Sequence, residues 1–195
     1  GQEIDFTIKG RHYHVFLPPL GTFQAMNVLC ALAIVIASGT DELEAIKGLQ
    51  GIKSVPGRME HILMDGQKSG VFVDYAHTPD GLETALKSLQ EHTSGKIFVV
   101  FGCGGDRDQS KRPIMGKIAA QYADCVIITD DNPRTEDPEK IRQHILRACS
   151  RGQEIPHREE AIAFALKNMG PEDTCLIAGK GHEQGQIIGD KVLPF

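Results

Sequence analysis

Four polar segments, two of them rich in glycine, carry side chains that can bind a charged group. Each follows an apolar run, and they are residues 74–79 (DYAHTP), 102–108 (GCGGDRD), 130–134 (DDNPR) and 179–183 (GKGHE). Glycine, aspartate, asparagine and proline are also ordinary turn formers, so each segment alone is weak evidence for a site. Together they combine arginines, carboxylates and an approachable backbone, which suits a small ligand that carries both charges.

Segment 131–134 is the most constrained of these. Pro133 fixes its own φ and restricts Asn132, so the polar side chains here have little conformational entropy to lose on binding. Arg134 offers a planar fork that suits a carboxylate, while Asp131 and the Asn132 carbonyl can accept hydrogen bonds from an ammonium group. Opposite charges in one rigid loop suit a zwitterionic amino acid. An ordinary turn leading into the next helix explains the same residues and stays open at this point.

In segment 102–108, Arg107 stands between two acids that can orient it, and the glycines allow close backbone approach. The dinucleotide fingerprint GxGxxG is incomplete, because Arg107 occupies the place of its third glycine. An NAD enzyme is therefore disfavoured. A glycine-rich turn with a solvated arginine remains the alternative for this segment.

Segment 179–183 contains Gly-Lys, as a phosphate loop does, but the spacing GxxxxGK[ST] occurs nowhere in the sequence. Glu183 can instead bind a second ammonium group, with His182 orienting it, and an exposed charged turn is the alternative. His12 and His14 alternate along one expected strand but lack a third ligand. We therefore expect no metal site.

The elements that must position these segments alternate along the chain. Strands are expected at 97–101, 126–129 and 174–178, and helices at about 79–91, 113–122, 138–150 and 158–168. A hairpin with arms 62–64 and 71–73 and a turn at Asp65-Gly66 precedes them, and residues 186–193 are expected to return as an edge strand. This order predicts an α/β fold, a mostly parallel Rossmann-like sheet with helices on both faces. Ligands of such sheets bind at the carboxyl ends of the strands, where all four segments leave.

The first part of the chain has a different pattern. Alternating apolar residues predict a hairpin of residues 4–8 and 13–17 about a turn at 9–11, followed by a helix over 23–38. A second helix is expected with Thr40 as its N-cap and with a buried stripe made of Leu43, Ile46 and Leu49. Val55-Pro56-Gly57 then breaks all periodicity, and we interpret it as a hinge between domains 1–56 and 57–195.

Composition excludes several classes of protein. With 195 residues, of which 41% are hydrophobic, the chain can bury a core. The formal net charge is −5 and the basic residues are scattered, so we expect no nucleic-acid partner. The longest apolar run, 29–37, is too short for a membrane helix, and we expect a cytoplasmic protein without a membrane partner. The 5 cysteines include no CxxC pair, so we expect reduced packing residues.

The four segments in this order, preceded by residues 56–60 (PGRME), resemble the Mur ligases over nearly the whole chain. Segment 131–134 is similar to the one that, in this family, marks enzymes selecting meso-diaminopimelate over L-lysine. The resemblance implies a C-terminal remnant of the central ATP-binding domain over 1–56 and the C-terminal Rossmann-like, amino-acid-binding ligase domain over 57–195. The start without methionine, directly in strand-like alternation, also led us to expect a piece of a longer protein.

The resemblance also implies roles for particular residues. The residues implied to bind the incoming diaminopimelate are Arg107, Asp131, Asn132, Pro133, Arg134, Gly179 and Glu183. Those implied to lie near the nucleotide are Asn27, Arg58, Asp74, Tyr75 and His77.

The reaction implied is a step of peptidoglycan precursor synthesis. ATP phosphorylates the terminal carboxylate of UDP-MurNAc-L-Ala-D-Glu, and the amine of meso-diaminopimelate attacks the acyl phosphate. ATP and Mg²⁺ would be cofactors of the full-length enzyme, held mainly by upstream residues, so we expect this chain alone to be inactive and the enzyme to be a monomer. The alternative from another class is a non-catalytic amino-acid-binding or regulatory module that uses the same edge of the sheet.

Overall fold

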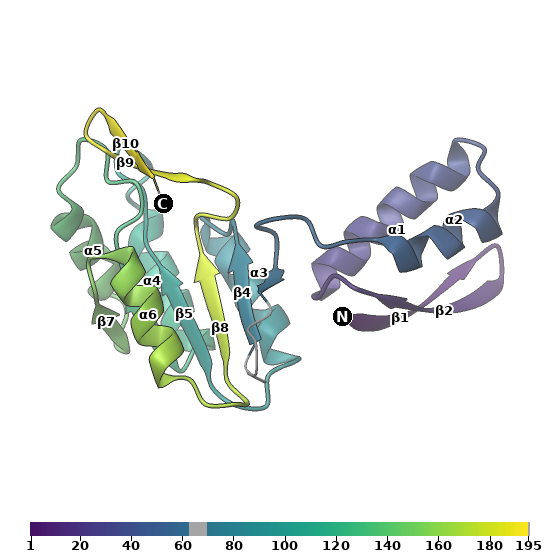
Figure 1. The fold of residues 1–195 in the computed structure, drawn as a ribbon, viewed down its shortest axis with the longest axis horizontal. Helices are drawn as coiled ribbons and strands as arrows, with labels where there is room; N and C mark the ends of the chain where they lie inside the picture. Colours follow the sequence, from purple (N-terminus) through teal and green to yellow (C-terminus); the bar gives the residue numbers. More distant parts are fainter. Residues whose placement is uncertain (63–69, 195) are drawn as a thin grey trace. The chain divides into compact units, whose positions relative to one another are not determined.

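The computed structural model describes residues 1–62 and 70–194. The chain divides into two compact units, Gly1–Val55 and Pro56–Phe195, each with its own hydrophobic core (Figure 1). Among the described residues, no helix combines the length and the apolar character needed to cross a bilayer.

The first unit begins with the expected antiparallel hairpin of β1 (Gln2–Ile8) and β2 (Arg11–Leu17). Its two-residue turn places Lys9 and Gly10 at positive φ, which suits the twist of a tight hairpin. Helix α1 (Thr22–Ala37) and helix α2 (Glu42–Gly48) follow, and a 3-10 turn (Leu49–Gly51) ends the unit. Apolar residues of the hairpin and of both helices form one core.

The predicted start of α2 was wrong by one residue. Asp41, not Thr40, is the N-cap, because its carboxylate accepts hydrogen bonds from the N–H groups of Leu43 and Glu44 at 3.0 and 3.1 Å. A carboxylate also stabilises the positive end of the helix dipole, which a threonine does not. Leu43 is 52% exposed, so the expected buried stripe is limited to Ile46 and Leu49.

The second unit is built on a six-stranded sheet in the order β3-β4-β8-β5-β6-β7. These strands are β3 (Glu60–Ile62), β4 (Gly70–Asp74), β5 (Ile97–Phe101), β6 (Cys125–Ile128), β7 (Gly152–Glu154) and β8 (Thr174–Ala178). All neighbours pair in parallel except β3 and β4, which are antiparallel. The expected pairing of the two arms is therefore confirmed at Ile62 and Val71. The rest of the expected first arm, residues 63–64, and the expected turn at Asp65-Gly66 lie outside the described residues.

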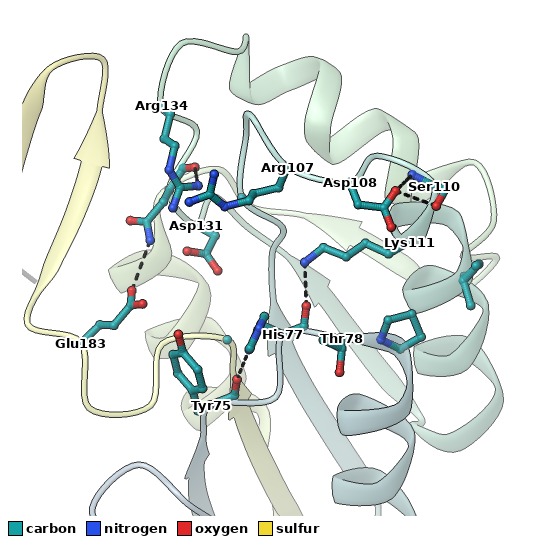
Figure 2. A pocket seen from close by; sticks show the side chains of 15 residues that line it. Tyr75, His77, Thr78, Arg107, Asp108, Ser110, Lys111, Asp131, Arg134 and Glu183 are labelled. Atoms are coloured by element: carbon teal, nitrogen blue, oxygen red, sulfur yellow. Dashed lines mark hydrogen bonds between the residues drawn. The ribbon is translucent and has the colours of Figure 1, made fainter.

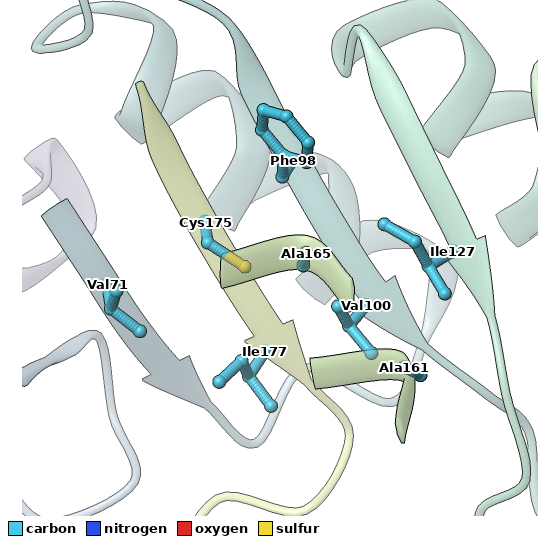
Figure 3. Close-up of a cluster of buried hydrophobic side chains, with 8 residues drawn as sticks. All are labelled: Val71, Phe98, Val100, Ile127, Ala161, Ala165, Cys175 and Ile177. Atoms are coloured by element: carbon cyan, nitrogen blue, oxygen red, sulfur yellow. The ribbon is translucent and has the colours of Figure 1, made fainter. Parts of the chain in front are cut away.

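Helices cover both faces of this sheet, as predicted. They are α3 (Pro79–Gln90), α4 (Lys111–Tyr122), α5 (Pro138–Leu146) and α6 (Arg158–Asn168) (Figure 1). The chain moves across the sheet from β5 to β7 and then returns to β8, so right-handed crossovers place α6 on the face opposite α4 and α5. Ala161 and Ala165 of α6 pack against a cluster that includes Phe98, Val100 and Ile177 (Figure 3).

Two of the helices that begin beside the four segments, α3 and α5, have clear start signals. Thr78 accepts a hydrogen bond from the N–H of Gly81 at 3.2 Å, and Pro79 occupies the first turn of α3. In the same way Asp137 caps α5, with Pro138 in its first turn. Both caps fix where a loop ends and a helix begins, and thus where the loop side chains stand.

The closing segment does not join the main sheet, and the expectation of an edge strand was wrong. Strands β9 (Gly185–Ile188) and β10 (Lys191–Pro194) pair with each other as a separate antiparallel hairpin. The backbone of β9 is instead bonded to the loop after β6. The N–H of Arg134 donates to the carbonyl of Ile187 at 3.2 Å, and the N–H of Gly189 donates to the carbonyl of Arg134 at 2.8 Å.

The cysteines offer a test of the core. All five are free thiols, and burial raises the pKa of Cys103 and of Cys175 to about 12, whereas Cys30 is exposed. Because the thiolate is the nucleophile, iodoacetamide at about pH 8 is expected to label Cys30 within minutes and to leave Cys103 and Cys175 intact in the folded chain. Peptide mass spectrometry measures this, and rapid native-state labelling of Cys175 would contradict the described core.

Candidate functional site

The four segments meet at one edge of the sheet, after β4, β5, β6 and β8, and surround a cavity of about 490 Å³ (Figure 2). Six of the seven residues expected to bind an amino acid line it, namely Arg107, Asp131, Asn132, Arg134, Gly179 and Glu183. Tyr75 and His77 from the nucleotide group line the same cavity. Pro133 is buried in its loop and is not among the lining residues.

Arg134 and Arg107 provide the positive side of the cavity. Arg134 adopts a φ of 53°, and its Nη1 donates to the carbonyls of Gly105 and Asn132 at 2.9 and 3.3 Å. A methyl group placed on Gly104 would lie 2.8 Å from Nη1 of Arg134 and 3.9 Å from Cγ of Arg107. Both arginines therefore flank the backbone of Gly104, and their side chains converge there.

A hydrogen-bonded cluster of Asp106, Thr135, Glu136 and Arg112 joins the loop after β5 to the loop after β6. The carboxylate of Asp106 accepts hydrogen bonds from the hydroxyl and the N–H of Thr135 at 2.8 and 3.1 Å, and these bonds lower the pKa of Asp106. Glu136 accepts from the N–H of Asp106 at 2.6 Å and from Arg112 at 2.9 Å, and the Arg112 bond lowers the pKa of Glu136. This cluster holds the loop that carries Arg107 against the loop that carries Arg134.

The negative side of the cavity is formed by Asp131 and Glu183. Nδ2 of Asn132 donates to Oε2 of Glu183 at 3.2 Å, which links the loops after β6 and β8 (Figure 2). Oδ1 of Asn132 accepts from Nζ of Lys180 and from the N–H of Ile187, both at 2.8 Å. The Asn132 side-chain carbonyl, which we expected to accept from a ligand ammonium, thus already has two donors within the protein.

The remaining expected residues divide by role. Asp74 is buried, and its carboxylate accepts from the N–H groups of Met59 and Ala76 at 2.8 and 2.7 Å; burial raises the pKa of Asp74 against the lowering effect of these bonds. Asp74 does not line the cavity. Its hydrogen bonds instead fix the backbone just before β3 and just after β4. The guanidinium of Arg58 stands 4.8 Å from the ring centroid of Tyr75.

Tyr75 and His77 form an aromatic pair at the rim of the cavity. Their ring centroids are 4.7 Å apart, and Nδ1 of His77 lies 2.9 Å from the Tyr75 carbonyl. Nζ of Lys111 donates to the His77 carbonyl at 2.7 Å. Asn27 belongs to the first unit, where its amide lies 3.5 Å from Oε1 of Gln24, and it is not among the residues that line this cavity.

A family model described as "Mur ligase, glutamate ligase domain" matches residues 57–181. The chain belongs to the Mur ligase family. This confirms the resemblance read from the motifs. The match covers most of the sheet unit, and it includes three of the four segments around the cavity in full together with residues 179–181 of the fourth.

Curated relatives within the Mur ligases share one name, "UDP-N-acetylmuramoyl-L-alanyl-D-glutamate--2,6-diaminopimelate ligase". The protein from Caulobacter vibrioides is 47% identical over 195 residues, which are 100% of this chain and 40% of the relative. The protein from Zymomonas mobilis is 50% identical over 199 residues, covering 100% of this chain and 41% of the relative. The chain thus spans about two fifths of the length of the curated relatives it matches.

Solved Mur ligase structures agree with the α/β fold. A structure of a ligase with the same name has a TM-score of 0.72 at 39% identity and covers 99% of this chain and 40% of its own. A pseudomurein peptide ligase type C from Methanothermus fervidus has a TM-score of 0.70 at 23% identity, over 92% of this chain and 37% of its own. The second likeness shows the fold alone.

Sequence reasoning missed several residues of this Mur ligase site. Thr78, Asp108, Ser110, Lys111 and Ile114 also line the cavity. Lys180, Arg112 and Arg158 are charged yet buried, and no pattern in the sequence distinguishes a buried cation from a solvated one. For Lys180, its position inside segment 179–183 was the only available signal. In the described part of the chain, no group of three or more His, Cys, Asp or Glu side chains is placed to hold a metal ion.

Proposed function

We propose that this chain is the C-terminal part of an ATP-dependent ligase that adds meso-diaminopimelate to UDP-MurNAc-L-Ala-D-Glu. The observation that carries the proposal is the single cavity with Arg107 and Arg134 on one side and Asp131 and Glu183 on the other. Such a cavity suits the far end of diaminopimelate, which carries an ammonium and a carboxylate on one carbon. The shared name of the relatives supports the same substrate.

Each group of the ligand has a matching partner in this proposal. Arg134 and Arg107 bind the distal carboxylate, since a guanidinium fork can donate two parallel hydrogen bonds to it. The Gly179 carbonyl, Asp131 and Glu183 accept from the distal ammonium. Gly179 has a φ of 102°, and a methyl group there would lie 3.0 Å from Oδ2 of Asp131. Glycine therefore keeps that carbonyl and that carboxylate accessible from the same side.

The same arrangement explains a preference over L-lysine, which lacks the second carboxylate. Lysine in this cavity would leave Arg107 and Arg134 without their anion. A site built to hydrogen-bond a charged group discriminates strongly against an analogue that lacks it, because the protein groups then lose their partner. Selection of diaminopimelate would thus depend on the positive side of the cavity.

For the nucleotide we propose that Tyr75, His77 and Arg58 lie on the ATP side, while Asp74 supports them through the backbone. We propose a nucleotide contact for Asn27 separately, as a residue of the first unit. The Arg58 guanidinium over the Tyr75 ring and the tilted contact between Tyr75 and His77 give a cationic, aromatic rim that suits a nucleotide. In the full enzyme Mg²⁺ would neutralise charge on the transferred phosphoryl group. The residues of this chain orient the attacking amine.

We propose further that the unit Gly1–Val55 is the end of a central ATP-binding domain. Helix α1 is apolar on nearly all sides, and Ile34, Met26 and Val35 remain 66%, 55% and 42% exposed. A helix that is hydrophobic all round is normally buried on all sides, so this one is expected to pack against further residues of a longer protein.

The proposal is tested by comparing this chain with the full-length ligase. The full-length protein is expected to release ADP only when ATP, UDP-MurNAc-L-Ala-D-Glu and meso-diaminopimelate are all present. The 195-residue chain alone is expected to form no amide, because it has no phosphate-binding loop of the GxxxxGK[ST] type. Coupled ADP assays and mass spectrometry of the product measure both.

Two results would overturn parts of this proposal. Amide formation by the 195-residue chain alone would contradict the need for upstream residues. Tight calorimetric binding of diaminopimelate to this chain, combined with no diaminopimelate-dependent ADP release by the full-length protein, would favour the non-catalytic binding module instead.

A further inference from the structure

Lys180 is a buried cation directly behind the proposed amino-acid cavity. Its side chain is 2% exposed, and Lys180 is not among the residues that line the cavity. Its Nζ lies 2.8 Å from Oδ1 of Asn132 and 2.7 Å from the Gly185 carbonyl. The same nitrogen lies 3.5 Å from Oε2 of Glu183 and 3.7 Å from Oδ1 of Asp131. One ammonium group therefore contacts three of the proposed ligand-binding residues from behind.

This ammonium sets the orientation of the Asn132 amide. An ammonium group can only donate, so Asn132 must present its oxygen to Lys180. Its Nδ2 is thereby directed to Oε2 of Glu183, at 3.2 Å. The N–H of Ile187 donates to the same Asn132 oxygen at 2.8 Å and supports the same orientation. The contacts made to Glu183 thus fall on Oε2, on the side of Lys180.

Lys180 also separates two negative charges. Asp131 and Glu183 have side chains 8% and 33% exposed, and both stand within 4 Å of the Lys180 nitrogen. Two carboxylates in such a partly buried place repel each other unless a cation lies between them. Arg158 of α6 is the second buried cation nearby, and its guanidinium donates to the carbonyls of Asp130 and Ala178.

The same lysine ties the closing hairpin to the Arg134 loop. Lys180 donates to the carbonyl of Gly185 at the start of β9, and Nε2 of Gln186 donates to the Asp131 carbonyl. The N–H of Ile187 donates to Oδ1 of Asn132, and the Ile187 carbonyl accepts from the N–H of Arg134. Arg134 is held by these contacts at a positive φ, a conformation that costs a non-glycine residue free energy and persists only where its surroundings fix it.

We propose that Lys180 is a positioning residue. It holds Asp131 and Glu183 in place for the ligand ammonium, directly and through Asn132, and it holds Arg134 in place for the ligand carboxylate through β9. This inference rests on the proposed function. Lys180 acts behind the cavity, so its removal changes how well the amino acid binds rather than how ATP binds.

The test compares Lys180→Met with Lys167→Met in the full-length ligase. Methionine has nearly the same length without the charge, and Lys167 is an exposed lysine of α6 that serves as the matched control. Lys180→Met is expected to raise KM for meso-diaminopimelate by about 30-fold, with KM for ATP and kcat at saturation changed less than about threefold. Lys167→Met is expected to leave all three unchanged.

Hydrogen–deuterium exchange of the same samples provides a readout that does not depend on the substrate. Lys180→Met is expected to speed exchange in peptides covering 131–136 and 183–189 while leaving the central strand β5 protected. Unchanged exchange in those two peptides overturns the positioning role, even if the wild type shows no diaminopimelate-dependent ADP release. A wild-type ligase without diaminopimelate-dependent ADP release would contradict the proposed function, but it would not contradict the positioning of the loops by Lys180.

Gln186→Ala tests the positioning proposal if Lys180→Met does not fold. Gln186 is half-buried and does not line the cavity, and its loss removes one bond between β9 and the Asp131 carbonyl. It is expected to raise KM for diaminopimelate by about fivefold with little effect on ATP. An unchanged or lower KM for diaminopimelate, or an equal rise for ATP, in either variant overturns the proposal.

Discussion

Replacement of Arg134 by alanine in the full-length ligase is expected to lower kcat/KM for meso-diaminopimelate by roughly 100- to 1000-fold, while KM for ATP stays within about threefold. The variant removes the charged fork at the carboxylate end of the cavity, where Nη1 is already fixed by the carbonyls of Gly105 and Asn132. Because the fork is held before the ligand arrives, little ordering cost offsets its hydrogen bonds. Steady-state kinetics with each substrate varied in turn measures the effect.

Two further variants provide an intermediate case and a control for this expectation. Arg134→Lys keeps the charge without the fork and is expected to fall between wild type and Arg134→Ala. Arg147→Ala, at an exposed arginine that caps the C-terminus of α5, is expected to leave the kinetics unchanged. The preference for diaminopimelate over L-lysine should narrow in Arg134→Ala, since lysine loses nothing there. Equal losses for ATP and diaminopimelate would contradict the role given to Arg134.

Gly105→Ala is expected to be the most damaging small substitution in the site. A methyl group on Gly105 would lie 1.9 Å from the carbonyl oxygen of Pro133 and 2.8 Å from its carbonyl carbon, and backbone atoms cannot move aside as a flexible side chain can. The loops after β5 and β6 would have to separate, breaking the bond from the Gly105 N–H to the Asn132 carbonyl at 2.9 Å. We expect a loss of about 2–4 kcal/mol in the free energy of unfolding, together with loss of diaminopimelate use.

Gly170→Ala is the matched control for this substitution. A methyl group there would meet only Asp173, at 3.5 Å, which is an ordinary contact. We expect the free energy of unfolding of Gly170→Ala to lie within about 0.5 kcal/mol of wild type. Chemical denaturation followed by circular dichroism compares the two variants. A Gly105→Ala protein as stable as Gly170→Ala would mean that the two loops are not in contact in solution.

The regular part of the fold could be predicted from the sequence because its signals are local. Residues 97–101 are an uninterrupted apolar run, residues 174–178 are apolar after Thr174, and both are strands with the predicted bounds. Strand β7 escaped prediction because Gly152–Glu154 is short and polar at the edge of the sheet. The closing hairpin was misassigned because alternation predicts a strand but not its partner, which here is decided by the loop at Arg134.

The sequence predicts which residues come together at the site, because that depends on residue type and strand order. It does not predict which of them are buried behind the cavity and which line it. The carboxyl edge of a parallel sheet gathers loops that are far apart in sequence, so Arg107, Arg134 and Glu183 were expected together and line one cavity. Nothing in the sequence separates Asp74, which serves the backbone, from Asp131, which lines the cavity. The roles of individual site residues therefore stay predictions until the kinetic experiments are done.

The place of β8 in the sheet has a consequence for biosynthesis. This strand pairs with both β4 and β5, yet it is the last of the six to leave the ribosome. Until it emerges, β4 has no parallel neighbour, and the hydrophobic edges of β4 and β5 stay open to pairing with other chains. Nascent chains that stop before residue 178 should accordingly depend on chaperones, and the amino-acid cavity can close only after β8 and the loop that carries Glu183 have been synthesised.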